Sequence, residues 1–110
     1  MTSQERLLEM ESNERNALKA FMDKSDEATS AERQRLKDNW EIAEQKLTTA
    51  QTNGLKQTSS DLDSAVGKLK TANAEAKLAL DTITQISELL KKLEKATELA
   101  GKVLLAAAAV

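Results

Sequence analysis

The second half of the chain carries a regular alternation of apolar positions. Steps of three and four residues from Leu62 to Leu104 meet an apolar side chain everywhere except at Thr97. These positions, called the seam below, are Leu62, Ala65, Leu69, Ala72, Ala76, Ala79, Ile83, Ile86, Leu90, Leu93, Thr97, Ala100 and Leu104. Such spacing is typical of a helix with one continuous packing face. It predicts a single coiled-coil-like helix over residues 56–104, roughly 65 to 75 Å long.

Further leucines lie beside the seam and widen the apolar face of this helix. They are Leu78, Leu80, Leu89 and Leu99. A face this wide exceeds what one partner helix covers, which favours a bundle or a higher oligomer over a two-stranded coiled coil.

The first half of the chain predicts shorter helices with weaker apolar stripes. One stripe, predicting a helix over residues 28–52, is Leu36, Trp40, Ala43, Leu47 and Ala50. The other, predicting a helix over residues 4–23, is Leu7, Met10, Ala17 and Phe21. Thr29 and Glu32 have the spacing of a capping box, and Asn53-Gly54 is the strongest turn signal. An unbroken helix over residues 4–52 is the alternative, and Ser60 with Asp63 is an alternative start for the last helix.

Composition agrees with an all-α fold in one domain, residues 1–110. The chain has no Pro, three Gly, one Trp and one Phe, whereas sheets favour aromatic residues and turns use Pro and Gly. The predicted architecture is an elongated helical hairpin or a three-helix bundle with one long C-terminal helix.

The residues needed for common catalytic and metal sites are missing. The chain has no His and no Cys, and it lacks Gly-rich loops that could hold a phosphate group. Acidic side chains cluster at Glu5, Glu9 and Glu11 and at Asp23, Asp26 and Glu27, but without the spacing of a calcium loop. We therefore predict no enzymatic activity, no cofactor and no metal site.

Charge argues against a nucleic-acid partner. The net charge is −2. Acidic residues lie close to both basic groups of the sequence, of which one is Arg33, Arg35 and Lys37 and the other is Lys91, Lys92 and Lys95. No aromatic residue that could stack on a nucleic-acid base lies among these basic residues.

The two ends of the chain bear on its location. Residues 1–10 lack the apolar core of a signal peptide, and the longest apolar run, residues 103–110, is too short to span a membrane. We expect a cytoplasmic protein, with secretion by a signal-free route left open. We interpret the apolar C-terminal end as packed in an oligomer. The alternatives are that it contacts a membrane surface, or that the chain is a fragment that ends inside a longer helix.

A cysteine-free helical hairpin of about this length resembles the WXG100 class of small secreted proteins. The turn at Asn53-Gly54, however, has no Trp two residues before the glycine, and the chain has no Tyr. The sequence is therefore assigned to no family.

The seam indicates a non-catalytic module for protein–protein interaction or oligomerisation. Its predicted partner is a second copy of the chain or a helix of another protein. The interaction residues expected from the seam are Leu62, Leu69, Ala76, Ile83, Ile86, Leu90, Leu93 and Leu104. Trp40 joins them as a hot-spot candidate, although core packing is the preferred interpretation. The alternatives are a membrane-associated helical protein that uses the apolar C-terminal end, and a small chaperone or adaptor for a helical partner in secretion or phage assembly.

Overall fold

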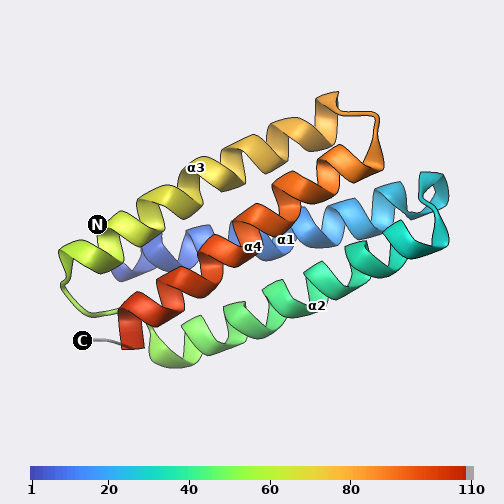
Figure 1. The fold of residues 1–110 in the computed structure, drawn as a ribbon. Coiled ribbons are helices and arrows are strands. Elements are labelled where there is room, and N and C mark those ends of the chain that lie inside the picture. Colours follow the sequence, from blue (N-terminus) through green and yellow to red (C-terminus); the bar gives the residue numbers. More distant parts are fainter. Residues whose placement is uncertain (109–110) are drawn as a thin grey trace.

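The computed structural model describes residues 1–108, which form four α-helices joined by short connections (Figure 1). The helices are α1 (Ser3–Lys24), α2 (Ser30–Asn53), α3 (Ser60–Thr82) and α4 (Ile86–Ala108), with a 3₁₀ turn at Ser25–Glu27. They lie side by side in an elongated bundle of 43 × 22 × 18 Å. The predicted all-α class is confirmed.

The bundle consists of two antiparallel helical hairpins packed against each other. One hairpin is α1 with α2, and the other is α3 with α4 (Figure 1). Between the hairpins α1 packs on α3, α2 packs on α4, and α1 also contacts α4 across the centre. Since α2 and α3 then occupy opposite corners, the connection between them crosses the end of the bundle.

The prediction of one helix over residues 56–104 is wrong. α3 ends at Thr82, and α4 begins at Ile86. Thr82, Ile83 and Thr84 are consecutive β-branched residues, which lose side-chain freedom in a helix and weaken it. Folding back at this point lets the apolar faces of α3 and α4 bury each other within one chain. The hairpin and three-helix arrangements are corrected accordingly to a bundle of four helices in the described part of the chain.

Helix ends follow the capping signals closely. The capping box of Thr29 and Glu32 is present at the start of α2, so the break between α1 and α2 is confirmed. Gly54 ends α2 in the left-handed conformation with φ 81°. Ser59 caps α3 by accepting a hydrogen bond from the Leu62 amide, so this helix begins near the alternative start and not at residue 56.

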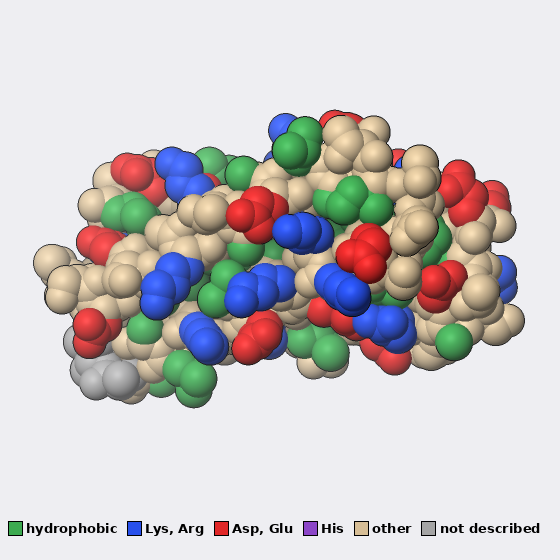
Figure 2. Space-filling view, turned by 45° about the horizontal axis from the view of Figure 1, so that its top comes forward, with side chains coloured by type: hydrophobic (Ala, Val, Ile, Leu, Met, Phe, Trp, Pro, Cys, Tyr) green, Lys and Arg blue, Asp and Glu red, His purple; other side chains and the backbone are tan. Residues whose placement is uncertain are grey.

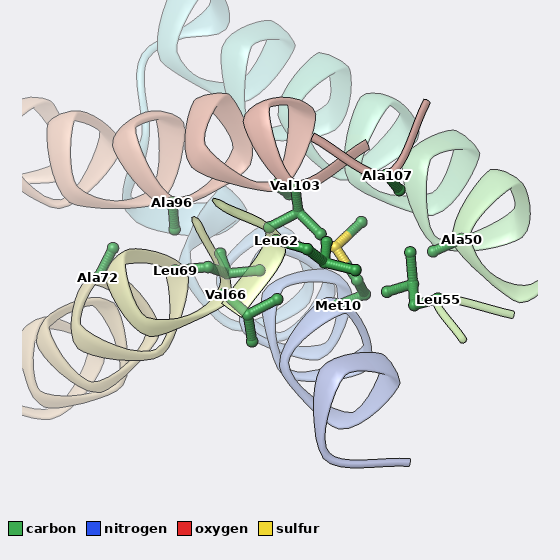
Figure 3. Packing of buried hydrophobic residues seen from close by; sticks show 11 residues of the cluster. Met10, Ala50, Leu55, Leu62, Val66, Leu69, Ala72, Ala96, Val103 and Ala107 are labelled. Atoms are coloured by element: carbon green, nitrogen blue, oxygen red, sulfur yellow. The ribbon is translucent and has the colours of Figure 1, made fainter. Parts of the chain in front are cut away.

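The hydrophobic core runs the length of the bundle and draws on every helix. Near one end, Met10, Leu55, Leu62 and Val103 point toward one another (Figure 3). Toward the other end, Leu36, Leu89, Leu90 and Leu93 pack with Ala20 and Ala76, among others. Alanines fill many of the remaining core positions, which lets the helix backbones approach closely.

The glycine in the middle of α3 weakens this helix without serving its packing. A Cβ added at Gly67 would meet nothing within 4 Å. Since glycine in a helix interior costs about 0.5–1 kcal/mol relative to alanine, we expect Gly67→Ala to raise the free energy of unfolding by that amount. Urea denaturation followed by circular dichroism measures the change.

Gly101 in α4 provides the matched control for this substitution. A Cβ there would lie 2.9 Å from the Lys46 Nζ, which donates a hydrogen bond to the Thr97 carbonyl. The gain in helix propensity is therefore offset by displacement of the lysine, and Gly101→Ala should stabilise less than Gly67→Ala. Equal gains at both positions would contradict this explanation.

Candidate protein-binding surface

Most of the predicted interaction residues lie in the core of the chain itself. Leu62, Leu69, Ala76, Ile86, Leu90 and Leu93 are each at most 7% exposed. Ile83 and Leu104 are half-buried, at the α3–α4 connection and on the last turns of α4. In the folded monomer most of the seam therefore stabilises the bundle and is not available as an outer surface.

Trp40 lies half-buried on α2 and stacks on Phe21 of α1. The ring centroids are 6.0 Å apart and the ring planes differ by 18°. The Trp40 Nε1 is buried and has no hydrogen-bond acceptor among the described residues. Trp40 thus joins the two helices of the first hairpin.

Buried polar side chains connect the helices, and these were not anticipated from the sequence. The Asn13 Nδ2 donates to the Thr97 Oγ1 at 3.1 Å, which links α1 to α4. The Lys46 Nζ donates to the Thr97 carbonyl at 2.8 Å, which links α2 to α4. Burial lowers the pKa of the Lys46 ammonium, and the nearby Glu98 carboxylate partly opposes that shift. Asn13 could have been found, because it continues the three-and-four spacing between Met10 and Ala17.

A second set of polar contacts joins α1 to α3. The Asn73 Nδ2 donates to the Glu9 carbonyl at 2.8 Å, and the Asn16 Nδ2 donates to the Asn73 carbonyl at 3.1 Å. These bonds fix the register of the two parallel helices, because each bond has a single geometry.

A buried arginine secures the connection that crosses the end of the bundle. The Arg6 side chain is 4% exposed, and its Nε lies 2.9 Å from the Asp63 carboxylate. Its Nη1 donates to the Leu55 carbonyl at 2.7 Å. Leu55 itself is fully buried and has a left-handed backbone with φ 48°. Arg6 therefore holds α1, α3 and the α2–α3 connection together.

The outer face of the second hairpin carries a shallow groove between α3 and α4. Two adjoining hollows of about 260 and 240 Å³ share Lys68 and Leu99 as lining residues. Their small and apolar lining residues are Ala65, Ala72 and Leu99, and their lysines are Lys68, Lys95 and Lys102. Apolar side chains lie among both basic and acidic side chains on this face (Figure 2).

The lysines of this groove are free of ion pairs with the described residues. No carboxylate of residues 1–108 lies within 4.0 Å of Lys68, Lys95 or Lys102. Of the carboxylates that line the groove, Glu75 is 3.8 Å from Lys92 and Asp61 lies at one end. The groove therefore combines small apolar side chains with three lysines that make no close ion pair, and with the carboxylates of Asp61 and Glu75.

A larger hollow of about 390 Å³ lies between α1 and α3, but its lining is different. It includes the basic residues Arg15, Lys19, Lys70 and Lys77, together with the polar Asn16 and Asn73. The side-chain amides of Asn16 and Asn73 already bond across the two helices, so these polar groups of the hollow are engaged within the chain.

Two other kinds of site were suggested by the sequence, a metal site formed by acidic side chains and a membrane contact. Residues 1–108 bring no group of three or more acidic side chains close enough to hold a metal ion. None of the helices has a stretch of sufficient length and hydropathy to cross a membrane.

On the last turns of α4, Leu105 is 71% exposed while Val103 and Ala107 are buried. Residues 109–110 of the predicted apolar end lie outside the described part of the chain.

The described residues thus form a four-helix bundle with a groove between α3 and α4 that is lined by small apolar and charged side chains. Comparison with known proteins yields no matching family model, no matching curated protein and no matching solved structure. The function must therefore be argued from the surface of the molecule.

Proposed function

We propose that this chain is a non-catalytic interaction module that binds an acidic amphipathic helix along the groove between α3 and α4. The observation that carries the proposal is the groove itself, in which Ala65, Ala72 and Leu99 lie beside Lys68, Lys95 and Lys102. The predicted class of function is kept, but the contact uses only Ala65 and Ala72 of the seam, together with Leu99 beside it and the lysines on the outer face of α3 and α4.

A helix fits this groove better than an extended peptide. Extended peptides commonly gain affinity by adding a strand to a sheet edge, and the described residues form no sheet. A groove between two helices instead accepts the apolar face of a third helix, and the small side chains of Ala65 and Ala72 allow a close approach.

The partner helix should be acidic because of the lysines on both sides of the groove. Lys68 comes from α3, while Lys95 and Lys102 come from α4, so carboxylates on either flank of a docked helix would find a cation. Complementary charges of this kind speed association and select the partner, and hydrophobic burial supplies the affinity. A chaperone or adaptor for a helical partner would use the same contact.

Membrane attachment through the apolar C-terminal end stays a prediction with one supporting observation, the exposed Leu105. Val103 and Ala107 on the same turns pack into the core, so the apolar surface free to enter a membrane is smaller than the sequence suggests. The α3–α4 groove offers the larger contact, and we therefore prefer a protein partner.

A synthetic amphipathic helix of three heptads tests the proposal directly. The acidic peptide has Leu and Ala on one face and Glu elsewhere, and its matched basic version has Lys in place of Glu. In fluorescence anisotropy we expect saturable binding of the acidic peptide and no measurable binding of the basic one. Lys68→Glu should weaken binding about tenfold at low salt, and 1 M salt should reduce that difference.

Lys37→Glu is the matched control for the charge reversal. Lys37 lies on α2, at the corner of the bundle opposite α3, so the same change of charge should leave binding nearly unaltered. The proposal is overturned if the acidic and basic peptides bind alike, or if Lys37→Glu weakens binding as much as Lys68→Glu.

A further inference from the structure

The connection between α3 and α4 is short and has no residue that excludes a helix. It consists of Ile83, Thr84 and Gln85, with neither Gly nor Pro. The Ile83 amide still donates to the Ala79 carbonyl at 2.9 Å, as it would in a continuing helix. The chain leaves the helix at Ile83 through an ordinary extended conformation, with φ −90° and ψ 124°.

The apolar stripe keeps its phase across this connection. The spacing runs through Ala79, Ile83, Ile86 and Leu90 in steps of four, three and four residues. A hairpin does not require such continuity, because two separate helices can each place their own apolar face toward the core. A single helix with one packing face does require it.

We propose that the α3–α4 hairpin opens into one continuous helix and that two copies of the chain exchange α4. In this dimer, α4 of one copy packs on α1, α2 and α3 of the other, so the same core is rebuilt from two chains. Exchange of an identical element between copies is a low-cost route to a dimer because few contacts change. The partner is therefore a second copy of this chain.

Joining the helices adds hydrogen bonds that the closed monomer lacks. In the hairpin, the last carbonyls of α3 and the first amides of α4 are at helix ends, where they have no helical partners. The continuous helix pairs these groups with one another. Against this gain stands the entropy lost on association, so the exchanged dimer is favoured as protein concentration rises.

The other two connections are held in place by specific contacts. Between α2 and α3, Gly54 and Leu55 both have positive φ, and Leu55 is held by Arg6. Between α1 and α2, Ala28 is buried and its amide bonds back to the Ser25 carbonyl. The α3–α4 connection also has backbone hydrogen bonds, from the Ile83 amide to the Ala79 carbonyl and from the Leu89 amide to the Gln85 carbonyl, but both join residues four apart and are kept in a continuous helix. It is therefore the connection at which the bundle opens.

Substitutions at Thr84 separate the closed form from the open one. Proline costs the closed connection no hydrogen bond, because the Thr84 amide has no partner in the described chain, and Ile83 already has the extended conformation favoured before proline. Proline in the middle of the continuous helix would break it. Thr84→Ala instead favours the helix and should tighten dimerisation about five- to tenfold, because two connections straighten per dimer.

Sedimentation equilibrium after refolding at increasing protein concentration provides the readout. We expect the unsubstituted chain to form a dimer fraction that grows with concentration, Thr84→Ala to form more, and Thr84→Pro to remain a folded monomer with unchanged helical circular dichroism. A monomer at every concentration for both the unsubstituted chain and Thr84→Ala overturns the proposal. A dimer that is unaffected by Thr84→Pro overturns it too, since that dimer would form through another surface.

An intrachain distance gives a second test that does not depend on a proline variant. The chain has no Cys, so spin labels on Lys68→Cys and Lys95→Cys are the only labels present. These residues line the same hollow in the hairpin, whereas a continuous helix separates them by about 40 Å. With excess unlabelled chain, pulsed electron paramagnetic resonance on the dimer should give the long distance. A short distance in the dimer rules out the exchange.

Discussion

Leu90→Ala is expected to lower the free energy of unfolding by about 2–5 kcal/mol, because it leaves a cavity in the core of the bundle. Leu90 is fully buried on α4 and packs in the cluster that includes Leu36, Leu89 and Leu93. A small domain often has a total stability of only about 5–15 kcal/mol, so the loss is large in proportion. Urea denaturation of both proteins, monitored by circular dichroism at a single protein concentration, measures the difference.

Leu78→Ala is the control for this prediction, since the chemical change is identical. Leu78 lies on α3 and is 64% exposed, so its truncation removes little buried surface and should cost less than about 0.5 kcal/mol. Comparable losses at the two positions would mean that the seam does not form the core described above.

The sequence predicted the helices well because periodicity and capping are local properties. The apolar spacing located helical segments in both halves of the chain, and the pair Thr29 and Glu32 placed the start of α2. The break at Ile83–Gln85 could not be read in the same way. The seam continues through it in phase, so the same pattern is satisfied by one long helix and by two helices that fold onto each other.

The length of the predicted helix argues against it in a single chain. A rod of residues 56–104 would expose most of its apolar face unless another chain covered it, whereas the bundle covers that face with residues of the same chain. Ile86, Leu90 and Leu93 are buried in this way. An apolar seam of this length therefore does not by itself imply a partner protein, because the other helices of the same chain can cover it.

The buried polar residues could not be predicted from the apolar pattern alone. Asn13 and Asn39 occupy inward positions of α1 and α2, and neither side chain is more than a few per cent exposed. The apolar pattern instead predicts Leu7, next to the buried Arg6, and Trp40, next to the buried Asn39, as core residues, although both lie half-buried at the edge of the core. The α3–α4 groove was not predicted, because Leu99, which lines it, indicated from the sequence only a wide apolar face and a bundle.

Arg6→Met should cost about 2–3 kcal/mol of unfolding free energy, the second-largest effect that we predict. The substitution leaves the Leu55 carbonyl without its donor and the Asp63 carboxylate without its counter-charge. Breaking a fully buried ion pair costs about 3–5 kcal/mol, but the Asp63 side chain is 36% exposed and retains contact with water. We therefore expect a loss below that of a fully buried pair. Urea denaturation at 0.1 M and 1 M salt measures the loss of unfolding free energy.

The exposed pair of Arg35 and Glu94 separates this explanation from a general effect of removing an arginine. The Arg35 Nη2 and the Glu94 Oε1 are 2.6 Å apart, closer than the 2.9 Å between the Arg6 Nε and the Asp63 Oδ1. Hydrogen bonding to Glu94 raises the pKa of the Arg35 guanidinium. Both side chains are nevertheless at least 40% exposed, so water screens the pair and Arg35→Met should cost at most about 1 kcal/mol. If Arg35→Met destabilises the chain as much as Arg6→Met, the burial of Arg6 and its bond to Leu55 do not explain the stability of the crossing connection. If Asp63→Asn alone reproduces the whole loss, the ion pair is sufficient and the Leu55 carbonyl contributes nothing measurable.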